Sequence, residues 1–109
     1  MGDGSTRAMT LLVRPLAEPG PLVSASESTQ LRSGYVVLAP GTHVGEHSTA
    51  GGEEAILVLK GTAEVTSPGG TASAEAPAEV IVPAHTLHDV WNHTSASLEY
   101  VYVVVADRP

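Results

Sequence analysis

The chain has 109 residues and a formal net charge of −7 with the histidines neutral, and it is 42% hydrophobic and 16% charged. This length and composition are typical of one globular domain with a single modest core. The acidic balance gives no positive surface for nucleic acid or for an anionic membrane. The absence of cysteine excludes disulfides and cysteine-based zinc sites.

The sequence shows neither the pattern of a membrane-spanning helix nor that of a signal peptide. No apolar run reaches the roughly 18 residues that a membrane-spanning helix needs. Residues 1–10 are polar and lack the apolar stretch of a signal peptide. The simplest expectation is a soluble, cytoplasmic protein.

In chain order, short apolar runs alternate with turn residues every 8 to 12 positions, a spacing typical of a β-sandwich or barrel. No helical period is sustained, so we predict an all-β antiparallel fold. The predicted strands are Met9–Arg14, Leu31–Ala39, His43–His47, Ala55–Lys60, Ala63–Thr66, Thr71–Glu75, Glu79–Val82, His88–Trp91 and Leu98–Ala106.

The segments between these runs carry the turn residues. Ser67-Pro68-Gly69-Gly70 is the best hairpin loop, because proline and glycine fit the backbone angles of tight turns. Residues 1–8 are predicted to be a loose, flexible tail, and Ala17–Ser28 a loop or a poorly paired edge segment. We therefore predict one β-barrel domain over residues 9–109.

Two of the predicted strands are apolar on both faces. Ile56 and Val58 share one face of their strand, Leu57 and Leu59 share the other, and Tyr100–Val105 behaves similarly. A small sandwich needs only one buried face in each sheet. The extra apolar face predicts a covering partner, most simply a second copy of the chain in a homodimer.

Metal-ligand residue types are concentrated in the middle of the chain. The pattern reads Gly41-x5-His47-x-Thr49-x4-Glu54-x6-Gly61, followed by Pro83-x4-His88-x3-Asn92. Two histidines and a carboxylate with open positions are the donor set of non-haem Fe(II) sites.

Strand geometry sorts the neighbouring candidates. His47 and Thr49 would share a face about 6.6 Å apart, whereas His43 lies about 13 Å from His47 along a strand and should miss the same ion. Glu53 and Glu54 face opposite ways, so only one of the two can be a ligand.

These two segments resemble the motifs of the cupin family. The first cupin motif has the form G-x5-H-x-H-x(3,4)-E-x6-G, and here Thr49 replaces its second histidine. The second has the form G-x5-P-x-G-x2-H-x3-N, and here Pro77 and His85 stand at the two glycine positions. The likeness covers Gly41 to Asn92 and implies a single-domain cupin jelly-roll barrel.

The resemblance also implies a metal centre. Its spacing selects Glu54 over Glu53 and implies that His47, Glu54 and His88 are the metal ligands, with Fe(II) favoured and Mn(II), Ni(II) or Zn(II) as alternatives. Thr49 is expected to hydrogen-bond a metal-bound water or to pack as a strand residue. The competing interpretation is a vestigial, metal-free site.

The remaining candidates have weaker support. His85 is interpreted as a turn residue that tolerates a left-handed backbone, or else as an acid/base or extra ligand at the edge of the pocket. His43 is interpreted as an acid/base group at the pocket mouth or as a surface residue. The side chains expected near the ligands, in the pocket or behind it, are Thr49, Tyr35, Trp91, Asn92 and Tyr102.

Three functional hypotheses follow. The first is a metal-dependent enzyme on a small organic substrate, in which Glu54 is essential to the chemistry. The resemblance points to small cupin oxygenases (dioxygenase-type oxidoreductases), while a non-redox Lewis-acid isomerase, cyclase or lyase fits the same ligands. The second is a small-molecule-binding module without turnover, and the third is an accessory dimer with an inactive site.

Overall fold

The computed structural model describes residues 11–24, 28 and 30–105. These residues form eight β-strands and no helix. The strands are β1 (Gly20–Val23), β2 (Leu31–Leu38), β3 (Glu53–Lys60), β4 (Thr62–Ser67), β5 (Gly70–Glu75), β6 (Ala78–Val82), β7 (Asp89–Trp91) and β8 (Leu98–Val105).

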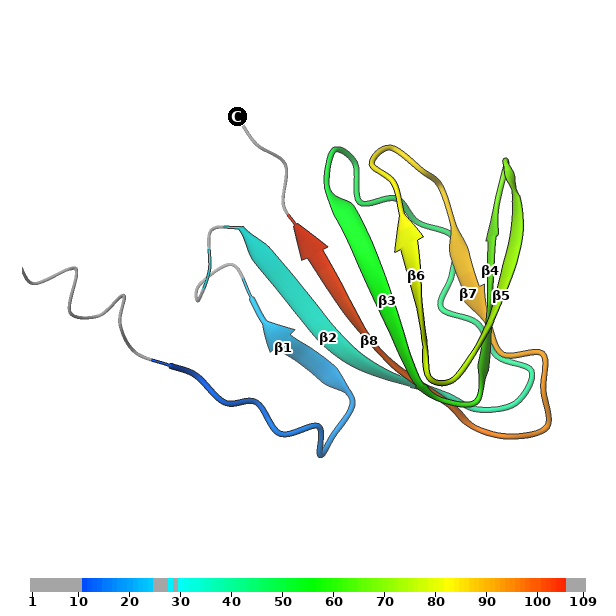
Figure 1. The fold of residues 1–109 in the computed structure, drawn as a ribbon, viewed down its shortest axis with the longest axis horizontal. Helices are drawn as coiled ribbons and strands as arrows, with labels where there is room; N and C mark the ends of the chain where they lie inside the picture. The colour runs from blue at the N-terminus through cyan, green and yellow to red at the C-terminus, as the bar shows by residue number, and fades with distance from the viewer. Residues whose placement is uncertain (1–10, 25–27, 29, 106–109) are drawn as a thin grey trace, which may run out of the picture.

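The strands build two antiparallel sheets. The larger sheet has the order β1-β2-β8-β3-β6, and the smaller has the order β5-β4-β7. Figure 1 shows the two sheets facing each other, with β6 of the large sheet leading towards β7 of the small one. The predicted all-β antiparallel architecture is confirmed for the described residues.

Alternation along the strands fixes which side chains fill the space between the sheets. Ile56 and Val58 on β3 are fully buried, as are Val90 on β7 and Leu98 and Tyr100 on β8. The intervening residues point away from the interior, because successive side chains on a strand face opposite ways. Ile56 and Val58 therefore share the inner face of β3, as predicted, and Glu54 lies on the same face.

Two turns follow directly from their residues. Gly61 joins β3 to β4 with φ of 84°, and a Cβ there would overlap the carbonyl oxygen of Ser97, so only glycine fits. Pro68 and Gly69 connect β4 to β5 in the predicted hairpin, where Ser67 donates from its hydroxyl to the Gly70 carbonyl at 3.1 Å.

Two predicted strands are wrong. Leu11–Arg14 belongs to no strand, and Met9 and Thr10 lie outside the described residues. His43–His47 is not a continuous strand either: it meets the β7 region through two isolated bridges, His43 to Trp91 and His47 to His88. An apolar run becomes a strand only where another strand edge is available to pair with it.

The expected loop or poorly paired edge segment contains β1. It is an edge strand that pairs with β2 through an irregular register, so the second alternative is confirmed for the described residues. Ala106 and the predicted tail, residues 1–8, lie outside the described part of the chain. Within that described part, no helix is long and apolar enough to cross a membrane.

Candidate metal centre

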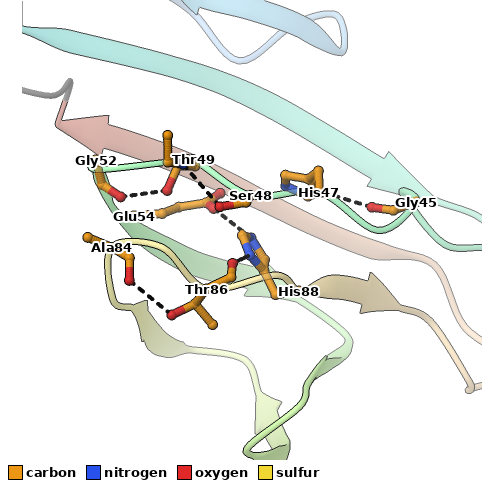
Figure 2. A network of polar contacts seen from close by, with 10 residues as sticks. Gly45, His47, Ser48, Thr49, Gly52, Glu54, Ala84, Thr86 and His88 are labelled. Carbon is orange, nitrogen blue, oxygen red and sulfur yellow. Dashed lines mark hydrogen bonds and ion pairs between the residues drawn. The ribbon is translucent and has the colours of Figure 1, made fainter.

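Three potential ligands converge in the interior from three separate segments. His47 lies in the irregular segment before β3, Glu54 is the second residue of β3, and His88 directly precedes β7. Their ligand atoms all lie within 4.8 Å of one another, and they form the one such set of three among the described residues. Figure 2 shows the Glu54 carboxylate reaching the His88 ring, with His47 close by.

The backbone brings the two histidines together. The His47 amide donates to the His88 carbonyl at 2.9 Å, and the His88 amide donates to the His47 carbonyl at 2.8 Å. The pair forms an antiparallel bridge, in which opposite side chains lie on the same face. The ring centroids are consequently 4.3 Å apart.

The hydrogen bonds of the rings determine which nitrogen can bind a cation. Nδ1 of His47 lies 2.8 Å from the Gly45 carbonyl, and Nδ1 of His88 lies 2.8 Å from the Thr86 carbonyl. A carbonyl oxygen only accepts, so Nδ1 of each ring carries the proton and Nε2 of each neutral ring keeps its lone pair. Metal-binding histidines are commonly oriented by a carbonyl in this way.

The arrangement fits a cation. Nε2 of His88 lies 2.9 Å from Oε1 of Glu54, and both side chains are buried. Two acceptor atoms at this distance need a positive charge between them, which a proton on His88 or a shared metal ion would supply. His47, Glu54 and His88 would hold such an ion, and imidazole with carboxylate suits Fe, Mn, Ni or Zn.

A cavity of about 390 Å³ opens beside the ligands, between the inner face of the large sheet and the segment before β3. Apolar side chains dominate its wall. The cavity is lined by Val36, Val44, Gly45, Glu46, His47, Thr49, Glu54, Val90, Tyr100, Tyr102 and Val104. It is large enough for a small organic molecule next to the triad.

Tyr100 and Tyr102 supply the hydroxyl groups on the strand side of this cavity. Tyr100 is buried, and that burial, together with the nearby charge of Glu54, raises its pKa above the ordinary value. Tyr100 therefore stays protonated at neutral pH and can act as a hydrogen-bond donor. The Tyr102 ring lies against Gly34, where any Cβ would overlap the ring.

The sequence profile of the family described as "Cupin domain" matches residues 34–105, which is most of the chain. The chain belongs to the cupin family.

Solved structures agree with this family. A predicted oxalate decarboxylase from Thermotoga maritima aligns with a TM-score of 0.77 at 19% identity, over 88% of this chain and all of that one (100%). A cupin 2 conserved barrel domain protein from Salinispora arenicola aligns with a TM-score of 0.72 at 25% identity, over 90% of both chains. The cupin domain of Schizosaccharomyces pombe Cnp3 aligns at 0.73 and 19% identity, over 82% of this chain and 64% of that one. The comparison with curated proteins finds no match.

The predicted cupin jelly roll is thereby confirmed, and the cupin interior is where the structure brings His47, Glu54 and His88 together. Glu53, the carboxylate excluded by spacing, is exposed on the opposite face of β3. Thr49 lines the cavity, but its hydroxyl donates to the Gly52 carbonyl and thereby closes the turn before β3. The second histidine of the family motif is therefore replaced by a residue that serves the turn.

Two predicted acid/base candidates lie elsewhere. His43 points to the outer face of the small sheet, where its Nδ1 lies 2.6 Å from Oδ2 of Asp89 and its ring stacks on Trp91. His85 is exposed and does not line the cavity beside Glu54. Its φ of 57° bears out the expected left-handed turn position.

Three of the residues expected near the ligands also lie away from the cavity. Tyr35 is on the outer face of the large sheet and donates to Glu99 at 2.6 Å, a bond that raises the pKa of Tyr35. Trp91 is on the outer face of the small sheet, because it alternates with the inward Val90. Asn92 is buried, but its side-chain amide donates hydrogen bonds to the Leu38 and Ala96 carbonyls. Alternation along the strands places Tyr35 and Trp91 on the outer faces, and Asn92 is used to close the loop that follows β7.

Sequence reasoning missed Asp89 and Gly45. Asp89 accepts hydrogen bonds from His43 and from the Gly45 amide at 2.8 Å, and Gly45 in turn accepts from His47. Neither residue belongs to a cupin motif position. The only signal in the sequence was the carboxylate directly beside His88.

Proposed function

We propose that this cupin is a metal-dependent enzyme acting on a small organic substrate, with oxygenase-type chemistry and Fe(II) as the favoured ion. The observation that carries the proposal is the convergence of His47, Glu54 and His88 beside a cavity of about 390 Å³. Three protein ligands leave positions open for exogenous ligands. A bound ion would supply Lewis-acid or redox chemistry at those positions.

The cavity wall indicates the class of substrate. Val36, Val90 and Val104 provide apolar surface, whereas the tyrosine hydroxyls of Tyr100 and Tyr102 provide polar contacts. A largely apolar molecule with one or two oxygen groups matches this distribution, since its oxygens can face the ion and the tyrosines. Protonated Tyr100 would orient such an oxygen by donating a hydrogen bond.

Elemental analysis of protein purified without added metal tests the proposal. Stoichiometric iron supports the oxygenase assignment, and manganese is compatible with it. Zinc instead favours the alternative of a Lewis-acid isomerase, cyclase or lyase. Failure to bind any of these ions after reconstitution contradicts the metal-dependent function and leaves a small-molecule-binding or accessory cupin.

We also propose that a second copy of the chain covers the outer face of the large sheet. Leu57 and Val101 lie opposite each other on this face, and Ile81 at its edge is 59% exposed. The segment before β1, which is not a strand, is more exposed still, with Leu11 at 91% and Val13 at 83%. Apolar surface of this extent is characteristic of an interface, and a homodimer would bury both features together.

A further inference from the structure

The segment that carries His47 is fixed by two backbone bridges to the β7 region and, on the outside of the barrel, by one carboxylate. Residues 43–47 form no continuous strand and touch the β7 region only at isolated bridges. Between the bridges, Asp89 reaches across: Oδ2 lies 2.6 Å from Nδ1 of His43, and Oδ1 accepts from the Gly45 amide at 2.8 Å. Asp89 is only 7% exposed despite its outward position.

Gly45 connects this outer carboxylate to the interior. Its amide donates outwards to Asp89, while its carbonyl accepts from Nδ1 of His47 at 2.8 Å. The φ of 115° at Gly45 is a conformation that L side chains rarely adopt, so one glycine can present its two polar groups to opposite sides of the sheet. Figure 2 shows the inner half of this connection, from His47 to the Gly45 carbonyl.

We infer that Asp89 is a positioning residue for the metal centre, which acts through the backbone of Gly45 to fix the ring orientation and the Nδ1 proton of His47. This inference rests on the proposed metal-binding function. It assigns to a residue outside the cavity the role that an outer-shell carboxylate has in other metal sites, where such partners orient the ligand. Here the carboxylate acts on the ligand through one residue, Gly45, whose N–H and C=O belong to two successive peptide groups, rather than directly.

The same surface offers a matched control. Glu64 and His93 form a second histidine–carboxylate pair at 3.3 Å, and His93 stacks on Trp91 as His43 does. No hydrogen bond leads from Glu64 to the segment that carries His47 in the part of the chain that the structure describes. Loss of Glu64 should therefore cost a surface contact and leave the metal centre unchanged.

The experiment is a titration of the metal-free, full-length chain with Co(II), whose visible d–d bands report ligand geometry. We expect Asp89→Ala to weaken Co(II) affinity about 10- to 100-fold and to change the band shape at saturation. Asp89→Asn keeps an acceptor oxygen for the Gly45 amide, so its affinity and spectrum should stay close to those of the unchanged chain. Glu64→Ala should match the unchanged chain in both.

The inference is overturned if Asp89→Ala keeps the affinity and spectrum of the unchanged chain, or if Glu64→Ala produces the same loss. A purely structural role would lower the melting temperature of the metal-free protein without altering the saturated spectrum. If Asp89→Ala does not fold, Asp89→Ser is measured with the same expectations. Failure of the unchanged chain to bind any ion would instead refute the proposed function.

Discussion

The molecule carries two clusters of histidines and carboxylates on opposite sides of β7. The inner cluster joins His47 and His88 to Glu54. The outer cluster, on the solvent side of the small sheet, pairs His43 with Asp89 and His93 with Glu64, with Trp91 stacked against both rings.

The difference between the clusters lies in convergence and burial. In the inner cluster three ligand atoms lie close together, with Glu54 and His88 buried and His47 half-buried, so their lone pairs can share a cation. In the outer cluster each histidine already has its own carboxylate and is exposed. Asp89 itself is largely buried, so solvent screens the His93–Glu64 pair more than the His43–Asp89 pair. The same residue types, histidine and carboxylate, therefore form a candidate metal centre on one side of β7 and a surface network on the other.

The largest expected effect tests the inner cluster. Glu54→Gln keeps the shape of the side chain but removes the negative charge, so metal affinity should fall by more than the roughly 100-fold that loss of an outer-shell partner costs. Activity should be lost with it, while circular dichroism stays unchanged. Metal content and calorimetric titration measure the effect.

Glu53→Gln is the control for this change, because Glu53 is the adjacent residue on the exposed face of β3. It should bind metal as the unchanged chain does. Retention of metal and turnover by Glu54→Gln would contradict the assignment of Glu54.

A second contrast concerns the outer faces of the two sheets, which are apolar on the large sheet and polar on the small one. Leu57→Asp places a charge in the middle of the proposed dimer interface, at a cost of several kcal/mol when buried. Light scattering should report a dimer for the unchanged chain and a monomer for this variant. Ser73→Asp, on the polar outer face, should leave the mass unchanged. A monomeric unchanged chain at micromolar concentration contradicts the dimer.

A change in the wall of the cavity should have an intermediate effect. Gly34→Ala places a Cβ against the Tyr102 ring, which must move, so we expect a loss of about 1–3 kcal/mol in unfolding free energy. Thermal denaturation measures this loss. Gly69→Ala, whose Cβ would meet only the Ser67 hydroxyl at 3.9 Å, should cost much less. The double variant Gly34→Ala with Tyr102→Val should recover part of the loss. Equal melting temperatures of Gly34→Ala and Gly69→Ala would disprove the overlap.

The smallest expected effect is the pH dependence of the outer cluster. Desolvation by burial acts to raise the pKa of Asp89, but the His43 hydrogen bond and the Gly45 amide outweigh it, so the net pKa lies below the ordinary value. A carboxyl with a lowered folded-state pKa contributes stability above its unfolded pKa of about 3.9, and that contribution is lost as pH falls through the folded value. We expect about 0.5–1.5 kcal/mol between the unchanged chain and Asp89→Ala at neutral pH.

This difference should begin to shrink as pH falls below about 4, where the unfolded chain takes up the proton, and should vanish below the lower folded-state pKa, where Asp89 is protonated in the folded chain too. Urea denaturation of the metal-free protein across the acid range measures it. Glu64→Ala provides the comparison, since the exposed Glu64–His93 pair should contribute little at any pH. A constant difference between the unchanged chain and Asp89→Ala down to the most acid point would contradict the role of the Asp89 charge.

Local pattern was sufficient for most of the fold. Alternation along Glu53–Lys60 places Glu54, Ile56 and Val58 inside, because strand parity is a property of consecutive residues. Pro68 and Gly69 define the β4–β5 hairpin for the same local reason. The run at Met9–Arg14 misled prediction because pairing depends on an available strand edge, which no pattern within the run reveals.

The sequence by itself determined the family motif and the three residue types that approach one point: His47, Glu54 and His88. Only the tertiary structure decided that His43, Tyr35 and Trp91 face outwards and that Asp89 holds the segment before β3 through Gly45. For Tyr35 and Trp91 the physical reason is that alternation along a strand does not say which of its two faces meets the other sheet. For His43 and Asp89 it is that residues 43–49 leave regular strand geometry. In an irregular segment, side-chain direction is set by hydrogen bonds to distant residues rather than by spacing along the chain.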